Sequence, residues 1–450
     1  MEIDTDPSSD SLLGQLQRGR GAGYLKALAV PRDVAQNALL DAICYDWRFD
    51  RQLEKRAHYY AWLARDLRLP LELLDRHLRE RDDRSIADRR SQMALAVLSI
   101  FAYWGSTFAR QSLQEYVSYG FRLWDVLCHL EDDMDEALAG DIADRLFRRI
   151  PDPAKFAEEC RVYDWYFEPE MLAPYWKQHS GLVWMQAMFT DKADEEHIET
   201  ATQAKIDFQD EALSVEEVFR RIAAGETCQE GHLKEWIKAN IRPNDIGMLL
   251  EIVTDETDHF SKLPGRSQVV RAAHTGLESL SAEVMLPFAR ESYKSPNRTL
   301  RRIAFKVLKG HGSEDDMRLM CSMMTPSLLA NDMYQVCDII EALRRFPGLG
   351  ITELEEAFRG ATYSWARALA AESLRISASD LFRESYAFEC LWDSEERIWC
   401  IGCQAVDLDN PLIRERVRFL ITIADHPARL EKAIAAVIDG PIAPIAGSRS

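Results

Sequence analysis

The chain has 450 residues, of which 47% are hydrophobic and 29% are charged. This is the composition of a folded protein, and the length is sufficient for two or three domains. Its 74 acidic residues outnumber its 55 basic residues, which gives a formal net charge of −19. Because nucleic acid is bound by clustered Lys and Arg, this balance argues against general nucleic-acid binding and makes basic proteins the easier partners.

The sequence contains no segment that predicts secretion or membrane insertion. Its start, Met1 to Asp6, is acidic, and no apolar stretch follows closely. The longest apolar run, 93–104, is too short to cross a bilayer and is typical of a buried helix. The nine cysteines are scattered through apolar helical patterns. We therefore expect a cytoplasmic protein with reduced cysteines and no membrane partner.

Almost no segment alternates polar and apolar residues with period two, so the predicted fold class is all-α. Residues 1–10 are polar and are expected to be disordered, and a helical region over 11–190 follows. Asp50 is a candidate N-cap for one of its helices. A polar boundary segment is predicted at 191–213. The helices expected in the first half cover 34–44, 51–67, 86–104, 113–130 and 136–150.

The segment 18–23 reads RGRGAG and could form a loop that holds a phosphate. It lacks the Gly-Lys-Ser/Thr ending of a P-loop, and no predicted strand precedes it. The preferred interpretation is a Gly-rich break between two helices.

The densest mixture of aromatic and basic side chains lies at 47–62. Trp, Tyr and Arg often dominate the binding energy of protein interfaces. In one interpretation this segment is packed inside the chain, with its charges paired to Glu54 or to another helix. In the other it binds a partner, provided that its side chains are exposed. The candidate partner-binding residues are Trp47, Arg48, Arg51, Tyr59 and Tyr60.

Asp132, Asp133 and Glu136 have a D-D-x-x-E spacing, which places carboxylates on one face of a helix. The spacing resembles the Mg-binding motif of class I terpene synthases, which are also all-α. The second motif of those enzymes is not matched, because Gln335 and Ile339 occupy two of its ligand positions. An Mg-dependent enzyme similar to a terpene synthase is therefore a remote alternative, and a solvated loop and helix start is preferred.

The second half carries a recurring helical unit with a step of 30 to 34 residues. Arginines followed by small and apolar residues stand at 271, 301, 367 and 397, and the copy missing between 301 and 367 is expected near 334. A period of this length indicates stacked helix pairs.

The segments 297–308, 363–374 and 393–406 resemble the second helices of HEAT or armadillo-like repeats. The resemblance covers about 214–437 and implies an α-solenoid of HEAT-like helix pairs with a scaffolding or adaptor role. The helical N-terminal half is less regular. Residues 438–450 are expected to form a flexible tail.

Cys400 and Cys403 form a lone CxxC, for which core packing is expected, since zinc needs four ligands. No complete set of nucleophile, acid/base partner and orienting group is recognisable. The sequence therefore predicts a non-enzymatic scaffold that binds another protein, with no cofactor or metal. The alternatives are a HEAT-like DNA-binding protein or DNA glycosylase, which would need a basic groove, and an acidic immunity or regulatory protein that neutralises a basic partner.

Overall fold

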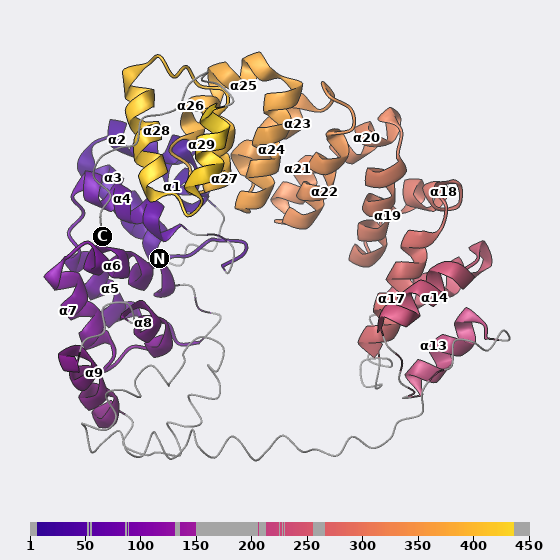
Figure 1. Ribbon diagram of the computed structural model, residues 1–450, viewed down its shortest axis with the longest axis horizontal. Coiled ribbons are helices and arrows are strands. Elements are labelled where there is room, and N and C mark those ends of the chain that lie inside the picture. Colours follow the sequence, from indigo (N-terminus) through magenta and orange to yellow (C-terminus); the bar gives the residue numbers. More distant parts are fainter. Residues whose placement is uncertain are drawn as a thin grey trace. The chain divides into compact units, whose positions relative to one another are not determined.

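The computed structural model describes residues 7–51, 54, 56–85, 88, 90–130, 136–149, 206, 213–224, 226, 228, 230–254 and 266–435 (Figure 1). Every regular element in these ranges is a helix, and they contain no strand. The predicted all-α fold class is therefore confirmed for the described part of the chain.

The chain divides into two compact units. We name them the split unit, residues 1–196 and 358–450, and the middle unit, residues 197–357. The predicted array over 214–437 is thus divided between the units, and the division falls inside helix α23 (Ile351–Gly360). Most of the predicted boundary at 191–213 and all of the tail at 438–450 lie outside the described residues.

The split unit combines helices from both ends of the chain (Figure 1). Its N-terminal helices are α1 (Leu12–Gln17), α2 (Gly21–Ala29), α3 (Arg32–Cys44), α4 (Ala57–Leu67), α5 (Glu72–Arg81), α6 (Gln92–Tyr103), α7 (Thr107–Tyr116), α8 (Leu123–Leu130) and α9 (Glu136–Arg149). Its C-terminal helices are α24 (Ser364–Ser377), α25 (Ser379–Ser385), α26 (Ala387–Cys390), α27 (Glu396–Cys403), α28 (Pro411–Ile423) and α29 (Pro427–Ala435). Helix α2 packs against α26, and α27 packs against α24, α26 and α29.

The helix predicted over 51–67 begins later than expected, at Ala57, and Asp50 does not cap it. The reason lies in Glu54 and Arg56, whose side chains are almost completely buried. Glu54 accepts a hydrogen bond from the backbone N–H of Ser364 at 2.8 Å, and Arg56 donates one to the carbonyl of Thr362 at 2.9 Å. These contacts hold Glu54 and Arg56 outside α4.

Two glycines of the RGRGAG segment let the ends of the chain approach closely. Gly19 has φ +69°, which favours glycine, and its carbonyl accepts a hydrogen bond from the backbone N–H of Ser394 at 2.8 Å. Gly21 lies against the backbone of Glu389, where an added Cβ would stand 1.8 Å from the carbonyl oxygen. The segment is therefore a junction between α1, α2 and the C-terminal helices.

The arginines of this junction bind groups of the split unit itself. Arg18 donates hydrogen bonds to the carbonyls of Gly360 and Gly14, each at 3.0 Å. Arg20 pairs with the Glu389 carboxylate at 2.9 Å. Both side chains are buried, so this structure uses them to hold the junction and does not present them to a phosphate.

The middle unit is built from helices that pack largely on their sequence neighbours. They are α13 (Val215–Ala223), α14 (Glu230–Asn240), the 3₁₀ helix η4 (Pro243–Asp245), α15 (Ile246–Thr254), α17 (Arg266–Ser279), α18 (Ala282–Ser292), α19 (Arg298–His311), α20 (Glu314–Cys321), α21 (Met324–Leu329) and α22 (Met333–Leu343). Helix α19 packs on both α18 and α22. Asn297 caps α19 by accepting the N–H groups of Thr299 and Leu300.

Two arginines of the recurring unit bind the beginning of the following copy. Arg301 on α19 donates to the side-chain oxygen of Gln335 on α22 at 3.0 Å. Arg367 on α24 pairs with Asp393, just before α27, at 2.9 Å, and both side chains are fully buried. Each arginine thus links two helices of the same unit that are separated in the sequence by two shorter helices.

The junction can be tested with Gly21→Ala. The added methyl group cannot fit against the Glu389 backbone, so we expect the free energy of unfolding to fall by about 1–3 kcal/mol. Gly310→Ala is the control, because Gly310 lies in α19 with no neighbouring atom within 4 Å of the added Cβ. Alanine there should be neutral or raise stability by up to about 1 kcal/mol. Urea unfolding followed by circular dichroism measures both, and equal effects would argue against the tight junction.

Candidate functional site

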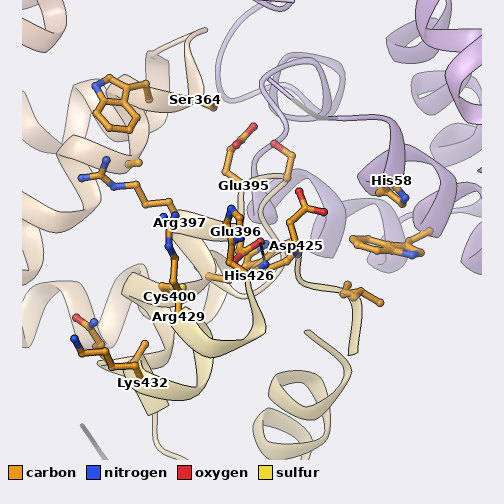
Figure 2. A pocket seen from close by; sticks show the side chains of 18 of the residues that line it. His58, Ser364, Glu395, Glu396, Arg397, Cys400, Asp425, His426, Arg429 and Lys432 are labelled. Atoms are coloured by element: carbon orange, nitrogen blue, oxygen red, sulfur yellow. Dashed lines mark hydrogen bonds between the residues drawn. The ribbon is translucent and has the colours of Figure 1, made fainter. Parts of the chain in front are cut away.

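A pocket of about 960 Å³ lies in the split unit, bordered by α4, α24, α27 and α29 (Figure 2). This volume is at the upper end of the range for ligand pockets in proteins. Its walls are mainly apolar. The apolar side chains are Trp62, Tyr363, Trp365, Ala368, Trp399, Ile423 and Ala433.

The aromatic wall of the pocket is held rigidly. The Trp62 ring lies 6.3 Å from that of Trp399 and 5.6 Å from that of Phe419, measured between centroids. The indole N–H of Trp399 donates to the carbonyl of Asp393 at 2.6 Å. Trp62 and Trp399 are nearly buried, with 6% and 5% of their surface accessible, so they form a fixed aromatic support, and Trp365 is the aromatic side chain that a ligand can reach.

Trp365 is the exposed aromatic residue of the lining, with 43% of its surface accessible. The guanidinium of Arg397 lies 4.2 Å from its ring centroid and also pairs with Glu372 at 3.2 Å. Such a cation–π contact contributes about 0.5–1 kcal/mol at an exposed site. It holds an arginine and a tryptophan together at the solvent side of the pocket.

Behind the pocket, buried charges fix the N-terminus of α24. The carboxylate of Glu54 pairs with Arg56 at 2.7 Å and accepts the backbone N–H of Ser364. A carboxylate at a helix N-terminus satisfies an otherwise unbonded donor and complements the helix dipole. Because Ser364 and its neighbours line the pocket, this ion pair determines the position of that wall.

Two adjacent carboxylates of the lining have different roles. Glu396 accepts the backbone N–H groups of Asp425 at 3.0 Å and of His426 at 3.3 Å, and thereby holds the loop before α29. Glu395 and Glu396 each have an oxygen, Oε1, that is buried without a hydrogen-bond partner among the described residues. Each carboxylate therefore keeps one acceptor that is not used inside the described part of the chain.

Burial raises the pKa of Glu395 to about 7. The positive charges of Arg367 and Arg56 lower this pKa. The carboxylates of Asp393 and Glu54 raise it further. Near neutral pH the side chain is thus present in both forms. The neutral form can donate a hydrogen bond, and the ionised form repels anions.

The basic residues of the lining come from two helices. Arg397 belongs to α27, and Arg429 and Lys432 belong to α29; all three are exposed. Figure 2 shows them on the left of the view, with Asp425 and His58 farther to the right. The Arg429 charge is close enough to Cys400 to influence its thiol.

The structure places most of the proposed partner-binding residues inside the split unit. Arg48 is buried and pairs with Asp46 at 2.7 Å. The hydroxyls of Tyr59 and Tyr60 donate to the carbonyls of Arg20 and Leu16, and both rings are buried. The required exposure is therefore absent at Arg48, Tyr59 and Tyr60, whose contacts serve the fold.

The other two candidates are partly buried. The Trp47 ring lies 5.2 Å from that of Tyr45, and Arg51 donates to the carbonyl of Asp88 at 3.3 Å. The residues of the 47–62 segment that do line the pocket are His58 and Trp62. Their ring centroids are 5.7 Å apart. The two residues are four positions apart in the sequence, which places them on one face of α4.

The other sequence motifs have structural positions or lie outside the described residues. Asp132 and Asp133 are outside them, and Glu136 begins α9. Burial raises the pKa of the Cys400 thiol to about 11 and that of Cys403 to about 12. Both thiols are therefore protonated at neutral pH. The expected core packing holds for Cys403, which is buried, whereas Cys400 is partly exposed and lines the pocket.

Among the residues with described positions, no group of three or more His, Cys, Asp or Glu side chains could hold a metal ion. None of the helices in the same part of the chain has the length and apolar character needed to span a bilayer. Comparison with known proteins gives no relative, since no family model, curated protein or solved structure matches the chain.

Substitution of Arg48 tests its assignment to the fold. Arg48→Ala leaves the Asp46 carboxylate buried without its partner, so we expect a loss of about 3–5 kcal/mol in the free energy of unfolding. Arg51→Ala should cost clearly less, because Arg51 is only partly buried. Guanidinium titrations of both variants give the comparison. Small and equal losses would contradict a structural role for Arg48.

The raised pKa of Glu395 predicts the direction in which the stability of the fold changes with pH. The pKa of Glu395 is about 7 in the folded chain, whereas the ordinary pKa of a Glu side chain is 4.5. Ionising the buried carboxyl therefore lowers the stability of the fold as pH rises between these two values. Glu395→Gln removes that penalty. Its stability relative to the parent protein should increase by about 2 kcal/mol from pH 5 to pH 8.

Thermal or urea unfolding at several pH values measures this difference. Glu415→Gln, at an exposed position of α28, is the control for the loss of one carboxylate. A Glu395→Gln effect that is constant with pH would contradict the burial of the Glu395 charge.

Proposed function

We propose that this protein is a non-catalytic, HEAT-like helical scaffold that binds a segment of another protein in the pocket of the split unit. The observation that carries the proposal is the preformed aromatic wall with the exposed Trp365 beside it. Aromatic side chains bury a large area with little loss of conformational freedom, and they commonly dominate protein interfaces.

The links between successive helices support the repeat part of the proposal. Helices α19 and α22 lie one step apart in the middle unit, and α24 and α27 lie one step apart in the split unit. In each case an arginine of the earlier helix, Arg301 or Arg367, reaches the beginning of the later one. Such nearest-neighbour contacts are typical of stacked repeats.

The chemistry of the lining favours binding over catalysis. Cys400 is a thiol whose raised pKa, about 11, leaves little of the nucleophilic thiolate at neutral pH. Ser364 lies at the first position of α24, and its backbone N–H is bound by Glu54, so this residue contributes to the wall. The carboxylate of Glu396 is used to hold a loop.

Buried arginines reduce the basic surface that a nucleic acid could use. Among the described residues, Arg18, Arg20, Arg48, Arg56, Arg122, Arg367 and Arg416 are buried. In a chain that already has a formal net charge of −19, this leaves still less positive charge at the surface. Protein segments are therefore a better match than DNA for the pocket.

A selection from a displayed library of random 12-residue peptides tests this function. Peptides that bind the purified full chain are measured by fluorescence anisotropy against Trp365→Ala. We expect a loss of affinity of about tenfold or more, the usual effect of removing an aromatic anchor from an interface.

Trp104→Ala is a matched control. Trp104 is 37% exposed and also has an arginine, Arg65, over its ring, but it lies outside the pocket lining. Its substitution should leave peptide affinity within about twofold, because about 0.4 kcal/mol corresponds to that factor. Selected peptides that bind Trp365→Ala as well as the parent chain would refute the proposal.

A further inference from the structure

The basic side chains of the pocket are placed to act together. Arg429 and Lys432 are three residues apart on α29, which puts them on the same face of the helix. Arg397 extends from α27 and is fixed by the Trp365 ring at 4.2 Å. All three line the pocket, and all three have exposed side chains that can still bind a ligand.

The carboxylates near these side chains neutralise only part of this charge. Glu372 pairs with Arg397 at 3.2 Å, so Arg429 and Lys432, which have no carboxylate partner among the described residues, are the main basic groups left to a ligand. Glu396 accepts the N–H groups of Asp425 and His426 with one oxygen, while its other oxygen is buried without a partner among the described residues. Glu395 is partly neutral near pH 7 because it is buried. Asp425 is exposed and lies away from the basic side chains in Figure 2.

We infer that the protein segment bound in this pocket is acidic, with carboxylates held by Arg397, Arg429 and Lys432 and an apolar side chain packed against Trp365 and Trp399. The inference rests on the proposed function and adds the chemistry of the ligand. It differs from the expectation drawn from net charge, because the charge that a ligand meets is that of the pocket.

The apolar walls make these ion pairs worth more than ordinary surface pairs. An exposed salt bridge contributes little, since water screens it. A carboxylate beside Trp365 and Trp399 would be partly shielded from water, and the effective dielectric constant there is lower. Arginine also offers two parallel N–H donors to a carboxylate, which fixes its orientation.

A segment with separate carboxylates fits better than a phosphate or a nucleic acid. The basic groups come from two helices, and Figure 2 shows Arg397 and Lys432 at separate places along the pocket, whereas a phosphate would require them around one point. Asp425 and the ionised form of Glu395 would repel a polyanion that filled the whole pocket. A peptide can instead place a neutral or apolar group near these two residues.

Because Glu395 titrates, the affinity for a charged peptide should change with pH in a direction that depends on the sign of the peptide's charge. Its protonated form can donate to a carboxylate or carbonyl oxygen, and its ionised form repels an acidic segment. The charged groups that face it are Arg367 of α24, Asp393 before α27, and Glu54 and Arg56 before α4. An acidic peptide should therefore bind more weakly as pH rises from 6 to 8, whereas a basic peptide should bind more tightly.

The test uses peptides selected from the random 12-residue library on the full chain. We expect the Trp365-dependent peptides to carry a net negative charge together with aromatic or aliphatic residues. Arg429→Glu/Lys432→Glu should weaken them at least tenfold. Arg32→Glu/Arg76→Glu changes the net charge equally at exposed positions outside the lining, and it should change affinity by less than threefold.

Circular dichroism checks that both double variants fold. If Arg429→Glu/Lys432→Glu does not fold, Arg429→Gln/Lys432→Gln replaces it, and we expect this variant to lose at least fivefold in peptide affinity. Affinity measured between pH 6 and 8 should fall with pH for the parent chain, and this fall should be smaller in Glu395→Gln. These results together would support an acidic segment as the ligand.

The contrary outcomes separate the two proposals. Neutral or basic peptides that depend on Trp365 would overturn the acidic ligand and leave the proposed function standing. Binding of inorganic phosphate alone as tight as that of the selected peptides, and lost in Arg429→Glu/Lys432→Glu, would also overturn it, in favour of a phosphate ligand. If no selected peptide depends on Trp365, the proposed function itself fails.

Discussion

The structure of the split unit depends on a buried ion pair between Arg56 and Glu54. Moving two charges out of water costs several kcal/mol, and the pair is favourable only when its remaining donors and acceptors are also bonded. Here the guanidinium donates to the carbonyls of Gln17 and Thr362, and the carboxylate accepts the N–H of Ser364. One pair thus joins the first helices, the segment before α4 and the beginning of α24. Loss of either partner would leave a buried charge without compensation.

The same network extends from the fold to the pocket. Arg367, three residues after Ser364, pairs with Asp393 in the interior, and the carbonyl of Asp393 accepts the indole N–H of Trp399. The position of an aromatic wall is therefore coupled to a buried charge. Glu395 follows two residues after Asp393, and burial beside this network raises its pKa to about 7. The burial that stabilises the unit also creates a group that titrates at the pocket.

Periodicity in the sequence predicted helices at α19, α24 and α27, because small and apolar residues at helical spacing report burial directly. It could not predict which arginines would be exposed. Arg367 and Arg397 occupy equivalent places in the repeat, yet the first is completely buried and the second lies at the pocket. The sequence pattern places Glu54 and Arg56 in the predicted helix over 51–67, and it could not reveal their partners, Ser364 and Thr362, which are about 310 residues away. The pocket could not be predicted for the same reason: its lining comes from four segments that are distant in the sequence. The sequence indicates 363–374 and 393–406 only as repeat-like helices and 47–62 only as a possible interface, and nothing in it shows that these segments meet.

If the ligand is acidic as proposed, net charge is a coarse guide to it, because net charge averages over groups with different surroundings. A formal charge of −19 repels an acidic partner at long range, but at physiological salt this repulsion is screened over a Debye length of about 8 Å. Contacts inside the pocket act over about 3–4 Å, beside apolar walls that weaken the screening. The basic side chains of α27 and α29 can therefore determine the sign of the charge that is bound, while the rest of the surface disfavours acidic molecules that lack a matching apolar group. On this proposal, selectivity arises from the combination of an ion pair with aromatic packing, since neither is sufficient alone.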